Sequence, residues 1–481
     1  SGSPNDGAPK MKEQPKEPRK FRGVEHFYID LGAHPRDRWK GVMKAYRKRL
    51  PQLVKKMWQS LGIPQEDVKD LGDSMMEDVR DGLDAVGRGD IFEEIKAISS
   101  DIGIDQGELL ALNMSYEMCS ACTAVVATEK DARGGACLAR TLDWELPVLR
   151  DLTIDVSFQR KGVTILRGTT WAGYVGMLTA LQPKAGFALA INFREQSMSD
   201  VARIGDNADI TGTMENIPWP VGILARDVLE NTSSLKEALR RLSTTPLLSP
   251  TYFILAGKDG EGMVITRDPV GECSRMQLGE DPPSHQGIST SARLAREELP
   301  ASSDSKAKAK PRKGPSRQRH GKSKGRKNAV SSSAPWRERH VLVQANMDHW
   351  AKSPAVDSQM SLPRLRLARQ LLPPATVPKQ AEGEQKVSTE SGFAYARDDL
   401  WRVMSTYPIW EEGFSVYATV MSPGLAVLET RIYDPDPHAP KKKPPVRRRR
   451  RGPTGRSQKG TNSDSKRRSK KDSGGRRKKR K

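Results

Sequence analysis

The chain has 481 residues and a formal net charge of +22, but the positive charge is concentrated in two segments. Residues 441–481 carry a net +19 and residues 301–330 a net +10, so the rest of the chain sums to −7. No run of about 18 apolar residues occurs, which argues against a membrane-spanning helix. Four cysteines in a chain of this length exclude a disulfide scaffold.

Biased composition divides the chain into parts. Residues 1–22 are rich in Pro, Lys and Glu and almost without apolar residues, which predicts a disordered leader. Residues 299–335 are rich in Lys, Arg, Ser and Pro and predict a disordered basic insert, because compact domains rarely contain structureless loops of this length. A disordered basic tail is predicted for 434–481. The globular part then consists of residues 23–121 and 122–433.

The segment 23–121 is predicted to be mostly helical after a short strand at 28–31. From Trp39 to Leu61 apolar residues recur at spacings of three and four, which forms one apolar stripe along a helix. Pro51 is expected to kink or divide this helix. The stripe needs cover, either from a sheet or from lipid.

A β-hairpin is predicted next, and it brings reactive side chains together. Two runs rich in apolar and β-branched residues, 122–128 and 136–143, are joined by a polar turn that contains two glycines. The hairpin returns Arg140 and Asp143 toward Cys122. Because the thiolate is the reactive form of cysteine and a neighbouring positive charge favours it, this grouping is typical of a nucleophile. The alternative is that Cys122 is a small core residue of a buried strand.

Metal binding is not expected at this hairpin. Cys119 and Cys122 form a CxxC pair, but neither a second CxxC nor a neighbouring His pair accompanies it, which argues against zinc. We therefore predict neither a metal nor a cofactor.

Beyond the hairpin, short strands alternate with a few helices, which predicts an α+β fold of stacked sheet and helix layers. Strands are expected at 152–159, 162–168, 186–193, 251–257, 262–267, 339–346, 413–420 and 424–430. Helices are expected at 219–229, 234–243, 361–372 and 396–404.

Several sequence blocks are more specific than these patterns. They are Tyr28–Leu31 with Arg38 and Trp39, Cys122–Thr123 with Arg140–Asp143, Trp171–Thr179, Leu229–Ser234, Tyr252–Gly257, Gly260–Asp268 and Gln344–Trp350. With these blocks, in this order from about residue 24 to residue 432, the chain resembles the family of acid ceramidases and N-acylethanolamine-hydrolysing acid amidases.

The resemblance implies an N-terminal-nucleophile hydrolase with an αββα sandwich. Such proteins are made as inactive precursors that cut themselves before the nucleophile, here between Ala121 and Cys122. Residues 1–121 would form a small helical subunit that stays docked on the larger, catalytic subunit. The new α-amine, with an ordinary pKa of about 7.7–8.0, would serve as the general base for the thiol of its own residue.

The resemblance also implies roles for individual residues. Arg140 and Asp143 would hold the amine and thiol, Asn346 would donate an N–H to the oxyanion, and Trp171 would support the site. Each has a simpler alternative, since Arg140 with Asp143 could form a surface ion pair worth under about 1 kcal/mol. Asn346 could likewise be an ordinary turn residue.

Two departures from the family pattern favour, as an alternative, a catalytically impaired homologue. The family has Asn-Glu-Arg where this chain has Asn192-Phe193-Arg194, so that Phe193 occupies the position of the Glu unless a one-residue slip lets Glu195 substitute. The family also has Asp-Asp-Arg-Arg where this chain has Asp-Ser-Gln-Met at 357–360. Arg364 or Arg366 from the next helix would then supply the missing arginine.

The resemblance implies an N-acyl lipid as substrate, with ceramide first and N-acylethanolamines second. The apolar stripe would line an acyl-chain groove, rest on a membrane, or belong to the ordinary core. Asn113 and Asn231 begin glycosylation sequons. Together with the resemblance they indicate a lysosome or another acidic secretory compartment.

The basic tail suggests a different partner. Its Lys and Arg clusters are typical of nuclear targeting, of nucleic-acid binding or of attraction to an anionic membrane surface. The tail and the insert lack interleaved aromatic residues that could stack on bases, which argues against a nucleic-acid partner.

Overall fold

Two β-sheets stack face to face in the part of the chain that the structure describes. The computed structural model describes residues 19–117, 121–130, 135–194, 218–280, 340–350, 360–372 and 394–434. All of them belong to one unit, residues 1–436, and residues 437–481 form a separate unit. The predicted insert, 299–335, lies outside the described residues, and of the predicted tail only Asp434 is described.

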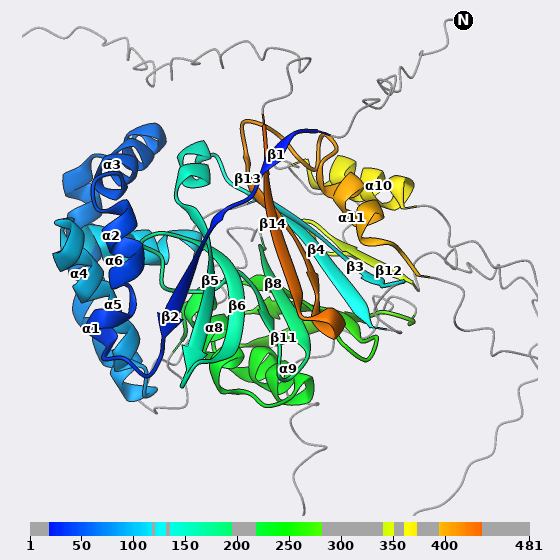
Figure 1. Ribbon diagram of the computed structural model, residues 1–481, viewed down its shortest axis with the longest axis horizontal. Coiled ribbons are helices and arrows are strands. Elements are labelled where there is room, and N and C mark those ends of the chain that lie inside the picture. The colour runs from blue at the N-terminus through cyan, green and yellow to red at the C-terminus, as the bar shows by residue number, and fades with distance from the viewer. Residues whose placement is uncertain are drawn as a thin grey trace, which may run out of the picture. The chain divides into compact units, whose positions relative to one another are not determined.

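The larger sheet has eight strands (Figure 1). Its order is β11 (Gly271–Gln277), β10 (Gly262–Asp268), β9 (Thr251–Gly257), β8 (Phe187–Phe193), β7 (Thr179–Gln182), β6 (Val163–Trp171), β5 (Thr153–Arg160) and β2 (Glu25–Asp30). Neighbouring strands are antiparallel except for β2, which pairs with β5 in parallel. The N-terminal segment therefore contributes a strand to this sheet.

The smaller sheet has six strands, all antiparallel, and it contains the predicted hairpin. Its order is β1 (Phe21–Arg22), β14 (Val427–Tyr433), β13 (Ser415–Ser422), β4 (Ala136–Asp143), β3 (Ala121–Thr128) and β12 (Val341–Gln344). Small and β-branched side chains fill the space between the sheets, including Ala124, Val126 and Leu138 against Ala190 and Ile254. These residues form the core behind the hairpin.

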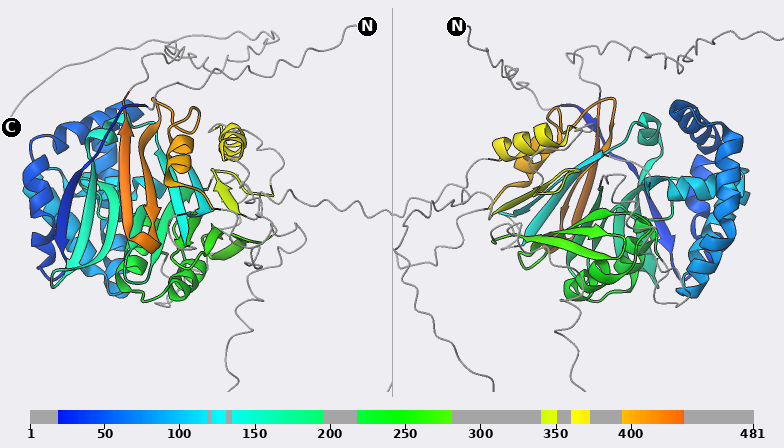
Figure 2. Two further views of the ribbon diagram at one scale, coloured as in Figure 1. Left: turned by 45° about the vertical axis from the view of Figure 1, so that its right-hand side comes forward. Right: turned by 180° about the vertical axis from the view of Figure 1, so that it is seen from behind.

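Helices cover the outer faces of both sheets (Figures 1 and 2). The helices are α1 (Pro35–Arg38), α2 (Lys40–Tyr46), α3 (Leu50–Leu61), α4 (Gln65–Ala85), α5 (Gly89–Ile102), α6 (Gln106–Met114), α8 (Val221–Asn231), α9 (Leu235–Thr244), α10 (Ser361–Leu371) and α11 (Arg397–Met404). Helices α10 and α11 pack on the six-stranded sheet. Phe158 of β5 contacts both Trp39, between α1 and α2, and Arg226 of α8, so both helix groups cover the eight-stranded sheet. The predicted order of helix, sheet, sheet and helix layers is confirmed.

The apolar stripe of the N-terminal segment is core. Trp39, Met43, Tyr46 and Met57 are all buried, and the helix is divided as predicted, with α3 beginning just before Pro51. The cover comes from protein, since Trp39 meets the ring of Phe158 edge-on at 5.9 Å. Among the described helices, none is both long and apolar enough to cross a membrane.

One sequence prediction needs correction, and three elements were not predicted. Residues 19–22 do not belong to a disordered leader, because Phe21 and Arg22 form β1 and pair with Tyr433 and Ile432 of β14. Helix α4 was not predicted, because only Val68, Gly72 and Leu83 of its 21 residues are buried and its apolar stripe is correspondingly thin. Strands β7 and β11 were also missed.

A buried ionic cluster joins the N-terminal helices to α8. Glu94 of α5 is completely buried and accepts hydrogen bonds from Arg226 Nη1 (2.6 Å) and Nη2 (2.8 Å). Trp39 Nε1 and Arg38 Nη1 donate to the same carboxylate, each at 2.7 Å. Burial alone would raise the pKa of Glu94, but the Arg226 guanidinium outweighs it and holds that pKa below its usual value. The carboxylate therefore stays ionised in mild acid.

Replacing Glu94 with Gln is expected to lower the free energy of unfolding by about 3 kcal/mol, because the buried guanidinium of Arg226 then loses one of its two carboxylate partners and keeps only Glu230. Urea unfolding at neutral pH measures the loss. Glu93→Gln is the matched control, since Glu93 pairs with Lys96 at the surface and its loss should cost under about 1 kcal/mol.

The difference in unfolding free energy between wild type and Glu94→Gln should depend on pH in a defined direction. A depressed folded-state pKa contributes stability that is present above the unfolded value, about 4.3 for Glu, and is lost as pH falls through the lower folded value. The gap between wild type and Glu94→Gln should therefore persist in mild acid. Equal losses in the Glu93 and Glu94 variants would contradict this account of the cluster.

Candidate active site

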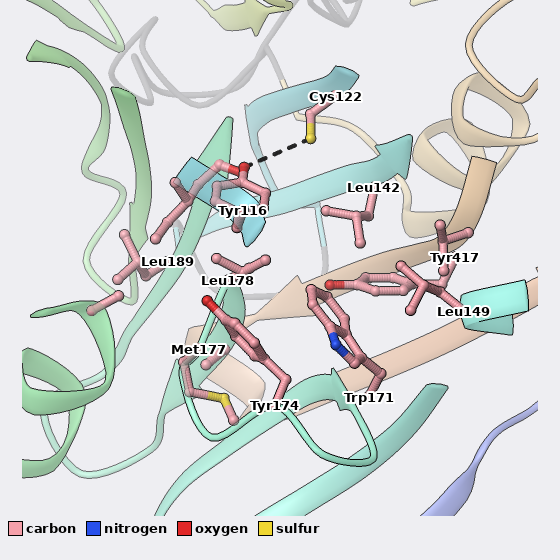
Figure 3. Packing of buried hydrophobic residues seen from close by; sticks show 14 of the residues in the cluster. Tyr116, Cys122, Leu142, Leu149, Trp171, Tyr174, Met177, Leu178, Leu189 and Tyr417 are labelled. Carbon is pink, nitrogen blue, oxygen red and sulfur yellow. Dashed lines mark hydrogen bonds between the residues drawn. The ribbon is translucent and has the colours of Figure 1, made fainter. Parts of the chain in front are cut away.

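Cys122 is the second residue of β3 and is completely buried. Its sulfur lies 2.8 Å from Arg140 Nη2 and 4.0 Å from the hydroxyl of Tyr116 (Figure 3). Its backbone N–H donates to Asn346 Oδ1 (2.8 Å), and its carbonyl accepts from Arg364 Nη1 (2.7 Å). The thiol and both backbone polar groups of this residue are therefore held by side chains.

Arg140 reaches the thiol from the neighbouring strand. In the β3–β4 ladder Arg140 lies opposite Ala124, and its Nη1 crosses to the other sheet, where it donates to Leu178 O (3.1 Å) and Thr179 Oγ1 (2.7 Å). Burial opposes its charge, but the nearby Cys122 and other acidic groups hold the pKa of Arg140 above its ordinary value. Because Arg140 is completely buried, it is not part of a surface ion pair.

Asp143 lies on the other face of the same strand. Side chains alternate along a strand, so the odd-numbered Asp143 points away from the even-numbered Arg140. Its carboxylate accepts from Ser415 Oγ (2.5 Å) and Thr141 Oγ1 (2.9 Å), with Arg364 Nη1 at 3.5 Å. Burial raises the pKa of Asp143, although Arg364 partly opposes it. The structure thus brings Arg140 to Cys122 but leaves Asp143 outside direct contact.

Asn346 follows β12, two residues after Gln344, which pairs with Ala124 of β3. This register brings its amide beside Cys122. While Oδ1 accepts from the Cys122 N–H, Nδ2 donates to the carbonyl of Phe193 at the end of β8 (2.7 Å). Asn346 is thus not merely a turn residue, because it links the first residues of β3 to the opposite sheet.

Arg364, near the start of α10, connects these groups. Besides the Cys122 carbonyl, it donates to Thr123 Oγ1 (2.9 Å) and Asn346 Oδ1 (2.9 Å). Its side chain is buried, whereas Arg366 on the same helix is exposed. Of the two arginines that sequence reasoning offered as substitutes, Arg364 lies at the site.

Aromatic and aliphatic side chains of the core lie on one side of the Cys122 thiol, with Tyr116 and Leu142 nearest to it (Figure 3). Trp171 stacks on Tyr174 with ring centroids 4.5 Å apart and meets Trp144 edge-on at 5.9 Å. Trp144 in turn meets Tyr116, which is 4.0 Å from the sulfur. Trp171 thus belongs to the apolar wall near the thiol and makes no recorded hydrogen bond to Cys122.

The remaining predicted residues are Glu195 and the two sequon asparagines, and none of them has a described contact with Cys122. Glu195 is outside the described residues, so the predicted slip from Phe193 stays a prediction. Asn113 is buried, and its amide donates to Gly173 O and accepts from Val175 N, contacts that a glycan would displace. Asn231 is exposed at the end of α8, and its glycosylation stays a prediction.

Sequence reasoning missed several members of the site. Tyr116, Ser415 and Tyr417 contact Cys122, Arg140 or Asp143 but carry no local motif, whereas Thr179 ends the block Trp171–Thr179 without having been singled out. The pairing of β13 with β4 brings Ser415 and Tyr417 there, and the stacking of the two sheets brings Thr179 to Arg140. Within the described ranges, no group of three or more His, Cys, Asp or Glu could hold a metal ion. The arrangement contains a buried sulfur, a guanidinium and a hydrogen-bonding amide. Such groups can serve as a nucleophile and as stabilising donors in an attack on a carbonyl.

Comparisons with known proteins agree with this chemistry. A family model described as linear amide C–N hydrolases, choloylglycine hydrolase family, matches residues 122–271, so the match begins at Cys122. An uncharacterized protein of Acanthamoeba polyphaga mimivirus is 31% identical over 251 residues, which are 52% of this chain and 74% of that protein. Human acid ceramidase is 32% identical over 272 residues, 52% of this chain and 65% of the ceramidase.

Among solved structures, the Caenorhabditis elegans ortholog of N-acylethanolamine-hydrolyzing acid amidase matches with a TM-score of 0.39 and 24% identity. That match covers 63% of this chain and 93% of the other. The chain spans just under two thirds of the length of human acid ceramidase. The sequence similarity and the family model together show that the chain belongs to the choloylglycine hydrolase and acid ceramidase family of linear amide C–N hydrolases.

Proposed function

We propose that this chain hydrolyses the amide bond of N-acyl lipids, with Cys122 as the nucleophile after self-cleavage between Ala121 and Cys122. The 2.8 Å contact between Arg140 Nη2 and Cys122 Sγ carries the proposal, because it sets a buried cation beside the sulfur that must attack the carbonyl. Membership of a family of linear amide hydrolases supports the reaction type.

Ceramide is the first candidate substrate, and N-acylethanolamines are the second. The similarity to human acid ceramidase supports this order. Localisation in an acidic compartment stays a prediction from the same relatives.

In the proposed self-cleavage, the Cys122 thiol gives its proton to water, Sγ attacks the carbonyl carbon of Ala121, and the bond to the Cys122 nitrogen breaks. Asp143 would protonate the departing nitrogen, and two observations support this role. Asp143 is paired with Ala121 across the β3–β4 ladder, and burial raises the pKa of its carboxyl. Water then hydrolyses the thioester, which leaves a carboxylate on Ala121 and a free amine on Cys122.

The proposed turnover repeats this chemistry on the substrate. The Cys122 amine takes the thiol proton, Sγ attacks the amide carbonyl, and Asn346 Nδ2 and neighbouring donors stabilise the oxyanion. The C–N bond breaks as the amine passes the proton to the departing sphingoid base or ethanolamine. Water hydrolyses the resulting thioester and releases the fatty acid.

Cys122→Ala is expected to abolish both activities. Mass spectrometry of the wild-type chain after incubation in mild acid should show two fragments, the larger beginning at Cys122, and a fluorogenic ceramide should release fatty acid. Cys137→Ala is the matched control, because Cys137 is buried on the neighbouring strand and hydrogen-bonds to Met421 O. An uncut, inactive wild type that binds DNA through residues 436–481 would instead favour a binding protein.

Asp143→Asn should slow self-cleavage by about a hundredfold or more, because an amide cannot transfer the proton. In the wild type the rate should rise as pH falls, since the raised pKa lets the carboxyl gain its proton at a higher pH than an exposed Asp. The variant should lose this acid limb in a pH series of cleavage rates.

Asp155→Asn is the control for this pH series, because burial raises the pKa of Asp155 to about 6 but its carboxyl contacts Thr169 and not the hairpin. An acid limb that survives in Asp143→Asn and disappears in Asp155→Asn would reject the role given to Asp143.

Arg364→Lys should lower both the cleavage rate and kcat by about tenfold to a hundredfold, because a single ammonium cannot replace a guanidinium that bridges Cys122 O, Thr123 and Asn346. Arg366→Lys, on the exposed side of the same helix, should change neither rate. Similar behaviour of the two variants would show that Arg364 is dispensable for the chemistry.

A further inference from the structure

The loop that carries Asn346 is held to the opposite sheet at two points. Asn346 Nδ2 donates to the carbonyl of Phe193, the last residue of β8 (2.7 Å). The next residue, Arg194, donates from Nε and Nη2 to the two oxygens of Asp348, each at 2.8 Å. The end of β8 therefore holds the loop through two residues of the loop, Asn346 and Asp348.

Two further residues of the same sheet hold the Arg194–Asp348 pair in place. Tyr252 of β9 donates its hydroxyl to Asp348 Oδ1 (2.7 Å), and Arg194 Nη1 pairs with Asp268, the last residue of β10. The Arg194 and Asp348 side chains are only 12% and 20% exposed, so solvent screens the pair weakly. Burial opposes the charge of Arg194, but Asp348, Tyr252 and Cys273 hold its pKa above the ordinary value.

We infer that Arg194 and Asp348 are positioning residues for the reaction proposed above, and that they act by fixing the orientation of Asn346 beside Cys122. The inference rests on the proposed function of Cys122 and Asn346. Among the described residues, Arg194 contacts neither Cys122, Arg140 nor Asp143, so its effect must pass through the loop.

The size of such an effect follows from the geometry. A bidentate guanidinium–carboxylate pair fixes both the distance and the angle between the two side chains, whereas a lysine ammonium at the same place fixes neither. Because Asp348 is two residues from Asn346, a shift of the loop moves the amide that holds the Cys122 nitrogen. Displacement of a reacting group by about 1 Å can cost a hundredfold in rate.

A double-mutant cycle on the full chain tests this inference with Arg194→Lys, Asn346→Ala and the double variant. Asn346→Ala should lower kcat by about a hundredfold or more. Arg194→Lys should lower kcat by about tenfold, with KM changed less than twofold, in the native background. In the Asn346→Ala background the same substitution should have under about a twofold effect, because the group that it positions is gone.

Arg275→Lys is the matched control. Arg275 forms a similar bidentate pair with Glu272 on β11. Neither residue of this pair contacts the loop among the described residues, although the neighbouring Ser274 contacts His349 (3.5 Å), so Arg275→Lys should leave kcat unchanged. Thermal unfolding of every variant distinguishes a loss of stability from a displacement of Asn346. Where a variant matures too slowly for turnover assays, the same cycle applies to the rate of chain cleavage.

The outcomes separate the two proposals. An inactive wild type overturns the proposed function, and the inference falls with it. If the wild type is active and Arg194→Lys lowers kcat equally in both backgrounds, the function stands and the positioning role is rejected. A fall in melting temperature without any loss of kcat would show that the pair only stabilises the fold.

Discussion

The pairing of β3 with β4 is the constraint on which the site depends. The register that sets Ala124 opposite Arg140 turns Cys122 and Arg140 toward the space between the sheets and Asp143 toward α10. Because the side-chain period of a strand is two residues, a slip by one residue would exchange these faces and separate the guanidinium from the sulfur. The buried side chains on both faces hold the register in place.

The site is assembled at one end of the two stacked sheets. Polar contacts join the sheets there, from Arg140 to Thr179 and from Asn346 to the carbonyl of Phe193. Elsewhere the interface consists largely of apolar side chains such as Ala124, Leu138 and Ile254, with a further polar contact between Thr169 and Thr430. Buried polar groups are costly unless they are paired, so these cross-sheet hydrogen bonds orient the reactive end while the apolar contacts supply the stability.

The N-terminal segment is integrated into the same unit. It supplies β2 to the eight-stranded sheet and Tyr116 to the wall beside the thiol, and Glu94 pairs with Arg226 across the boundary between the segments. In a chain cut before Cys122, these buried contacts would keep the segment attached without a covalent link. The segment is therefore part of the site as well as a cover for the sheet.

The sequence by itself determined the hairpin, most strands and helices and the approach of Arg140 to Cys122, because these follow from apolar periodicity and neighbouring positions, whereas the order of the helix and sheet layers followed from the family resemblance. It also pointed to Asn346 and to Arg364 as one of two candidates. Only the tertiary structure separated Arg364 from Arg366, turned Asp143 away from the thiol and brought Tyr116, Ser415 and Tyr417 to the site. These contacts join residues up to 272 positions apart, and local pattern carries no information on such distances.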